Sequence, residues 1–120
     1  MKDEGYEIVL QLNLWEMGDL LFHEQYHVVR LGMMHLSLDM SYAVPKDADI
    51  RHFSEMIDLY QHKKIFVHDA TGLGASSMVA LYLVQHGLSL DDAQQYVLPG
   101  WHPNAVWMAK FKQYQAMPAL

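Results

Sequence analysis

The chain has 120 residues, of which 52% are hydrophobic and 18% are charged, and its formal net charge is −6. This length and composition fit a single soluble globular domain over residues 1–120. The acidic balance argues against nucleic acid or an anionic membrane as a partner, because both require clustered Lys and Arg. Apolar runs are too short to span a bilayer and the first residues have no signal-peptide pattern, so we expect a cytoplasmic protein.

Cysteine is absent from the chain. Disulfides, thiolate metal ligands and catalysis by a thiolate nucleophile are therefore excluded. The sequence also gives no indication of a cofactor.

Strand-like and helix-like segments alternate along the chain. The predicted strands are rich in Ile, Val and Leu and cover residues 6–14, 33–38 and 64–68. The predicted helices carry apolar stripes at helical spacing and lie within residues 20–30, 47–60, 77–84, 89–96 and 104–114. The helix starts have candidate capping residues, namely Asp47 or Asp49, Ser89, and Asn104.

This alternation predicts an α/β fold, in which a parallel sheet is flanked by helices on both faces. Ligands of such sheets bind beyond the carboxyl ends of the strands. Residues 69–75, which follow the third predicted strand, lie at that edge.

The segment after the third strand reads His-Asp-Ala-Thr-Gly-Leu-Gly-Ala-Ser. It resembles the phosphate-binding loop of the cysteine-dependent protein tyrosine and dual-specificity phosphatases, whose signature is His-Cys-x-x-Gly-x-x-Arg followed by Ser or Thr. Asp69 stands at the position of the nucleophilic Cys, and Ala75 stands at the position of the phosphate-binding Arg. The candidate binding loop comprises His68, Asp69, Ala70, Thr71, Gly72, Leu73, Gly74, Ala75 and Ser76.

The resemblance extends over residues 5–111, to compact bacterial dual-specificity-phosphatase-like domains. The matching segments are Gly5-Tyr6-Glu7, Leu31-Gly32-Met33, Gly87 to Ala93, and Trp101-His102-Pro103-Asn104-Ala105-Val106-Trp107. The resemblance implies a further strand and helix upstream of the position of Gly5, close to which this sequence begins. A late gene start, a truncated sequence and a lost edge strand each account for this difference. A bare sheet edge tends to pair, so a homodimer is a further expectation. The resemblance also implies that Asp39, 30 residues before Asp69, stands at the general-acid position, although a plain loop carboxylate fits equally well.

The two departures from the signature remove the chemistry of the family. Ala75 cannot provide the bidentate clamp on phosphate, and Asp69 puts a negative charge where the phosphoryl group would bind. Because a helix N-terminus stabilises anions, we expect the Asp69 carboxylate to occupy the anion site itself. The sequence therefore predicts a pseudophosphatase with a binding or regulatory role toward an unknown protein partner; the alternative is a hydrolase with altered chemistry that uses Asp39 and Asp69.

A second motif, His23-Glu24-Gln25-Tyr26-His27, has the His-Glu-x-x-His pattern of zinc metalloproteases. On a helix His23 and His27 would share a face, with Glu24 as the general base. The expected positions of a third ligand hold Arg30 and Met33. A zinc-dependent hydrolase is therefore the weaker alternative to two ordinary helix histidines.

Overall fold

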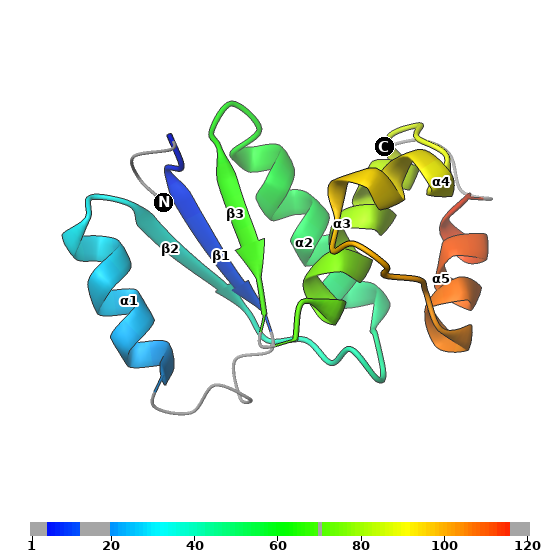
Figure 1. Ribbon diagram of the computed structural model, residues 1–120, viewed down its shortest axis with the longest axis horizontal. Coiled ribbons are helices and arrows are strands. Elements are labelled where there is room, and N and C mark those ends of the chain that lie inside the picture. The colour runs from blue at the N-terminus through cyan, green and yellow to red at the C-terminus, as the bar shows by residue number, and fades with distance from the viewer. Residues whose placement is uncertain (1–4, 13–19, 70, 116–120) are drawn as a thin grey trace.

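The computed structural model of the protein describes residues 5–12, 20–69 and 71–115. Three parallel strands form one sheet in the order β2-β1-β3 (Figure 1). Their bounds are Ile8–Leu12 for β1, Met34–Leu38 for β2 and Ile65–His68 for β3. In the middle of the sheet Leu10 lies opposite Leu36 on one side and Val67 on the other.

Helices cover both faces of this sheet (Figure 1). Their bounds are Leu20–Arg30 for α1, Asp47–Leu59 for α2, Leu73–Gln85 for α3, Leu90–Ala93 for α4 and Ala105–Gln115 for α5, with the 3₁₀ turn η3 at Gln94–Tyr96. Helix α1 lies on one face, whereas α2 and α3 lie on the other, with α5 packed against α3. None of the helices in these described ranges is long and apolar enough to cross a membrane.

Alternate residues of β1 supply two separate apolar clusters. Leu10 and Leu12 join the large cluster on the α2 and α3 face, together with Phe53, Trp107 and Phe111. The cluster on the α1 face is much smaller and consists of Val9, Val28 and Met33, with Tyr6 and Phe66 packed against it. This period of two is the pattern expected for a central strand that is buried on both faces.

The predicted α/β class, the parallel sheet and the helices on both faces are confirmed. The first strand is shorter than predicted because it begins at Ile8, and positions 13 and 14 lie outside the described residues. Helix α3 begins at Leu73, four residues before the predicted start at Ser77. The sequence prediction missed this first turn because it treated Gly72 to Ser76 as a loop, whereas small residues allow the chain to enter the helix there.

Two of the predicted helix caps are present and one is wrong. The side chain of Ser89 accepts the Asp92 N–H, and Asn104 Oδ1 accepts the Trp107 N–H. Helix α2 is preceded instead by Lys46, whose side chain makes no capping bond. Asp47 lies within the first turn, where its carboxylate binds the side chains of Lys110 and Tyr114 on α5.

Candidate functional site

The candidate loop connects the carboxyl end of β3 to the start of α3. His68 is the last residue of β3, and Leu73 is the first residue of α3. The free backbone N–H groups of a helix N-terminus therefore lie directly beyond the strand end, which is the arrangement that binds anions in α/β proteins.

The carboxylate of Asp69 accepts two of these backbone N–H groups. Oδ1 accepts the N–H of Gly72 at 2.6 Å, and Oδ2 accepts the N–H of Gly74 at 2.9 Å. The residue is 9% exposed, so the negative charge lies inside the loop rather than in solvent. Each bond joins an ionised acceptor to a backbone donor, which is the strong class of hydrogen bond. The loop therefore holds an anion that is part of the chain.

Gly72 allows the loop to close around this carboxylate. Its φ of +81° lies in the left-handed region, which favours glycine. A Cβ atom at this position would also meet Leu98 Cδ2 at 3.4 Å. The backbone conformation therefore favours glycine at the signature position, whereas the contact with Leu98 would be an ordinary van der Waals one.

The other end of the loop is apolar. Ala75 is 7% exposed and borders a hollow of about 240 Å³ that Leu98 and Tyr96 also line. The hydroxyl of Ser76 accepts the N–H of Leu98 at 3.2 Å, so the segment after η3 is fastened to the loop. Because Ala75 carries neither charge nor donor, its side chain cannot clamp a phosphoryl group.

Thr71 Oγ1 accepts the N–H of Leu73 at 3.2 Å. Ala70 lies outside the described residues.

Asp39 lies at the same edge of the sheet as Asp69. It directly follows β2 and is exposed, whereas Asp69 directly follows β3. Because β1 lies between these strands, β2 and β3 are two strand spacings of about 4.8 Å apart. The structure therefore puts both carboxylates at one edge, but the oxygens of Asp69 are already engaged by the loop.

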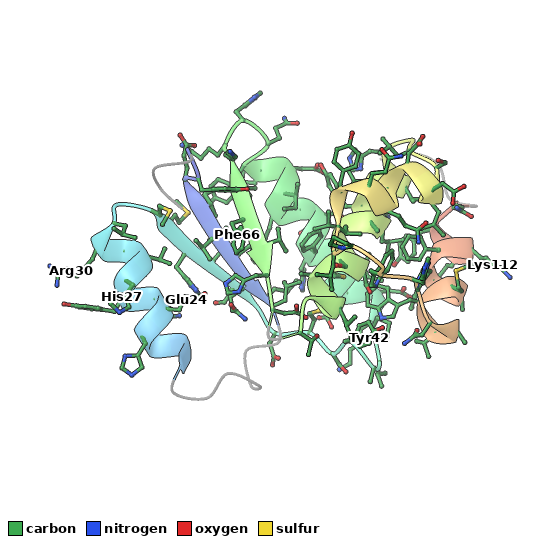
Figure 2. The ribbon with its side chains drawn as sticks, in the orientation of Figure 1. Glu24, His27, Arg30, Tyr42, Phe66 and Lys112 are labelled. Atoms are coloured by element: carbon green, nitrogen blue, oxygen red, sulfur yellow. The ribbon has the colours of Figure 1, made fainter. Side chains whose placement is uncertain are left out.

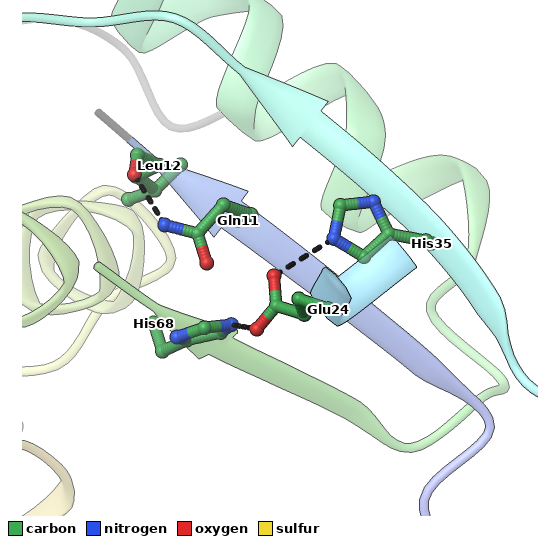
Figure 3. Close-up of polar contacts among 5 residues, drawn as sticks. All are labelled: Gln11, Leu12, Glu24, His35 and His68. Carbon is green, nitrogen blue, oxygen red and sulfur yellow. Dashed lines mark hydrogen bonds and ion pairs between the residues drawn. The ribbon is translucent and has the colours of Figure 1, made fainter. Parts of the chain in front are cut away.

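A polar cluster on the α1 face was not predicted from the sequence (Figure 3). Glu24 extends from α1 to the sheet, where Oε2 contacts His35 Nε2 on β2 at 2.9 Å and Oε1 contacts His68 Nε2 on β3. The contact with His68 lies out of line for a hydrogen bond and is an electrostatic one. For His35, whose Nε2 lies at hydrogen-bond distance from the carboxylate, a proton on Nε2 is the favourable tautomer. The cluster links α1, β2 and the loop-bearing strand.

Gln11 of β1 lies beside this cluster and is fully buried. Its Nε2 donates to the carbonyl of Leu12 at 2.7 Å, and its Oε1 has no hydrogen-bond partner (Figure 3). The sequence signal for the cluster was available, because Gln11 and His35 are polar residues that interrupt apolar strands. Such interruptions on one face of a sheet indicate side chains that must be paired inside the protein.

The His-Glu-x-x-His segment does not assemble the arrangement that a zinc hydrolase requires. His23 and His27 are exposed, while Glu24 points to the sheet, where it is held by His35 and His68 (Figure 2). Among the described residues there is no group of three His, Cys, Asp or Glu side chains placed to hold a metal ion. Glu24 acts as a link between helix and sheet instead of a free general base.

The fold is similar to that of several solved phosphatase structures. A DUF442 protein from Shewanella putrefaciens CN-32 superimposes with a TM-score of 0.78 over 96% of this chain and 76% of its own, at 20% sequence identity. PTPMT1 gives a TM-score of 0.73 at 22% identity, with 94% and 78% of the two chains covered. Kinase associated phosphatase, in a form with its catalytic-site cysteine changed to serine, gives 0.74 at 14% identity, with 95% and 71% covered.

No protein-family model and no curated protein sequence matches the chain. The similarity to known proteins therefore lies in the fold, and the chemistry of this site depends on the side chains of its loop.

Proposed function

We propose that the protein is a catalytically inactive, cytoplasmic phosphatase-fold module that binds a protein partner. The observation that carries this proposal is the Asp69 carboxylate, which accepts the loop N–H groups of Gly72 and Gly74. These groups belong to the part of the loop that would hold phosphoryl oxygens in an active phosphatase. The loop retains its anion-binding shape, and its own side chain takes the place of the ligand.

Energetics support this interpretation. A second anion about 4 Å from the Asp69 carboxylate would be repelled by about 4 kcal/mol at an effective dielectric constant near 20. The missing Arg at position 75 removes a bidentate partner, in which each charge-assisted hydrogen bond is worth about 1.5–3 kcal/mol. Both effects weaken phosphate binding, and the absence of cysteine removes the nucleophile.

The hydrolase alternative, with Asp39 and Asp69 as catalytic carboxylates, is less well supported. A carboxylate nucleophile for phosphate needs a cation that neutralises the incoming charge. Asp69 would also have to give up its bonds to Gly72 and Gly74 before it could attack.

Titration calorimetry with sulfate and orthovanadate tests the self-occupied loop. The wild-type protein should bind neither anion at millimolar concentration, whereas Asp69→Ala should bind both, because the substitution frees the two N–H groups. Asp39→Ala is the matched control, since it removes one charge from the same edge without opening the loop. Anion binding by the wild type, or equal gains in both variants, would contradict the proposal.

Restoring the signature tests the scaffold separately. The double variant Asp69→Cys with Ala75→Arg should gain aryl-phosphate hydrolysis, while each single variant should remain inactive. Measurable hydrolysis by the wild-type protein, abolished in Asp69→Asn, would favour the hydrolase instead.

A further inference from the structure

The outer edge of β3 lacks the features that normally protect an edge strand. Within the described ranges β3 pairs only with β1, and all four of its residues are partly exposed. Its sequence, Ile-Phe-Val-His, contains neither proline nor a Lys or Glu that would discourage pairing. Figure 1 shows no strand on this side of β3.

The backbone of β3 presents two residues to this outer edge. The carbonyl of Lys64 accepts the N–H of Glu7 at 3.0 Å and therefore points toward β1. The direction of the backbone N–H and carbonyl groups alternates from residue to residue along a strand. Those of Phe66 therefore also point toward β1, whereas those of Ile65 and Val67 point away from it. The outer edge thus offers the N–H and carbonyl groups of Ile65 and Val67.

An apolar groove follows the same edge. A hollow of about 550 Å³ lies beside β3 and is lined by Phe53 of α2, Leu83 of α3 and Phe66 of β3, among other side chains. It adjoins the smaller hollow at the loop, because Val67 and Tyr96 line both. A strand added to β3 would therefore bury apolar side chains along its length.

The charges at the two ends of β3 are opposite in sign. Lys63 and Lys64 precede the strand, whereas the partly exposed Glu24 carboxylate lies at its carboxyl end. Lys63 lies 3.6 Å from Glu7, and Lys64 lies over the ring of Tyr6, so both remain at the start of the strand. An antiparallel copy of β3 brings the basic end of each strand to the acidic end of the other.

We propose that β3 pairs with the β3 strand of a second copy of this chain, antiparallel and around a two-fold axis at Phe66. In this register Ile65 lies opposite Val67 of the second copy, and the two pairs form four backbone hydrogen bonds. Phe66 lies opposite its own counterpart beside Tyr6, with which it already makes an edge-to-face contact at 5.6 Å. The inference concerns the edge of β3 and is independent of what the loop binds.

Cysteine crosslinking tests the register directly, because the chain has no cysteine of its own. Phe66→Cys should form a covalent dimer under mild oxidation, since side chains at a non-hydrogen-bonded antiparallel pair lie close enough for a disulfide. Ser37→Cys, on the opposite edge of the sheet, is the matched control and should remain monomeric on a reducing-agent-free gel. Equal crosslinking of the two variants would overturn the register.

A proline substitution tests the pairing in the absence of any crosslink. Val67→Pro removes an N–H that points away from β1 and therefore leaves the β1–β3 ladder complete. Sedimentation should show a dimer for the wild type and for the control Ser37→Pro, and at least about tenfold weaker dimerisation for Val67→Pro. A wild-type monomer at all concentrations would overturn the proposal.

Hydrogen exchange on the wild-type protein identifies the occupant of the edge without any substitution. Protection of the Ile65 and Val67 amides should rise with protein concentration if a second copy pairs with them. Protection that is independent of concentration would mean that another segment of the same chain occupies the edge, and would also overturn the proposal.

Discussion

The two faces of the sheet differ in how they are held together. The α2 and α3 face packs a large apolar cluster in which Trp107, Phe53 and Phe111 are fully buried. The α1 face has only a small apolar cluster, and beside it the Glu24 carboxylate connects His35 and His68. The comparison indicates that one face provides most of the stability of the fold, whereas the polar face positions α1 and the strand that leads into the loop.

The largest expected effect is on the apolar face, at Trp107. This side chain is fully buried, its ring stacks with Tyr42, and its Nε1 donates to the Tyr42 carbonyl at 2.8 Å. Trp107→Ala should lower the free energy of unfolding by about 3–5 kcal/mol in chemical denaturation. Val106→Ala, on the exposed side of the same helix, should change it by about 0.5 kcal/mol or less. If Trp107→Ala lowered the free energy of unfolding by less than about 1 kcal/mol, the α2 and α3 face would not provide most of the stability.

A smaller loss is expected on the polar face, at Glu24. Glu24→Ala leaves the buried ring of His35 without its partner and should lower the free energy of unfolding by about 1–3 kcal/mol. His23→Ala, on the exposed side of α1, is the control and should cost about 0.5 kcal/mol or less. If the two variants were equally stable, the Glu24 contacts would have no part in holding α1 to the sheet.

The smallest expected effect is a loss of stability at alkaline pH, caused by two tyrosines on the α2 and α3 side of the sheet. Burial, together with the hydrogen bond to Asp58, raises the pKa of Tyr82 to about 12; burial and Asp47 raise the pKa of Tyr114 to about 12. The folded state therefore keeps these protons while unfolded tyrosine loses them near its ordinary pKa of 10. Stability supplied by the two phenols should be complete below pH 10 and should fall as the pH rises toward 12.

Titration of ultraviolet phenolate absorbance checks this expectation. Tyr82→Phe should remove one late-titrating phenol, and Tyr114→Phe should remove the other. An unchanged titration curve in Tyr82→Phe would show that the Asp58 contact does not retain the proton.

The sequence predicted the repetitive parts of the molecule better than its polar contacts. Apolar periodicity located the strands and helices, and the chemistry of helix N-termini correctly identified Asp69 as an acceptor of loop N–H groups. The role of Glu24 was missed because a local pattern with His23 and His27 suggested a metal site. Its partners are distant in sequence, so only the folded arrangement of α1, β2 and β3 brings them together. The contact between Leu98 and Ser76 was missed for the same reason.

Because its anion is the Asp69 carboxylate, the stability of the loop does not depend on anions in the surrounding solution. A phosphatase loop that binds a free anion is stabilised by mass action, in proportion to the logarithm of the anion concentration above its dissociation constant. Here the anion is tethered to the loop by the chain, so its local concentration is fixed and cannot be diluted. The melting temperature of this protein should therefore be the same in phosphate as in a non-binding buffer of equal ionic strength. The Asp69 carboxylate thus occupies the loop at every phosphate concentration, and the shape of the loop is independent of that concentration.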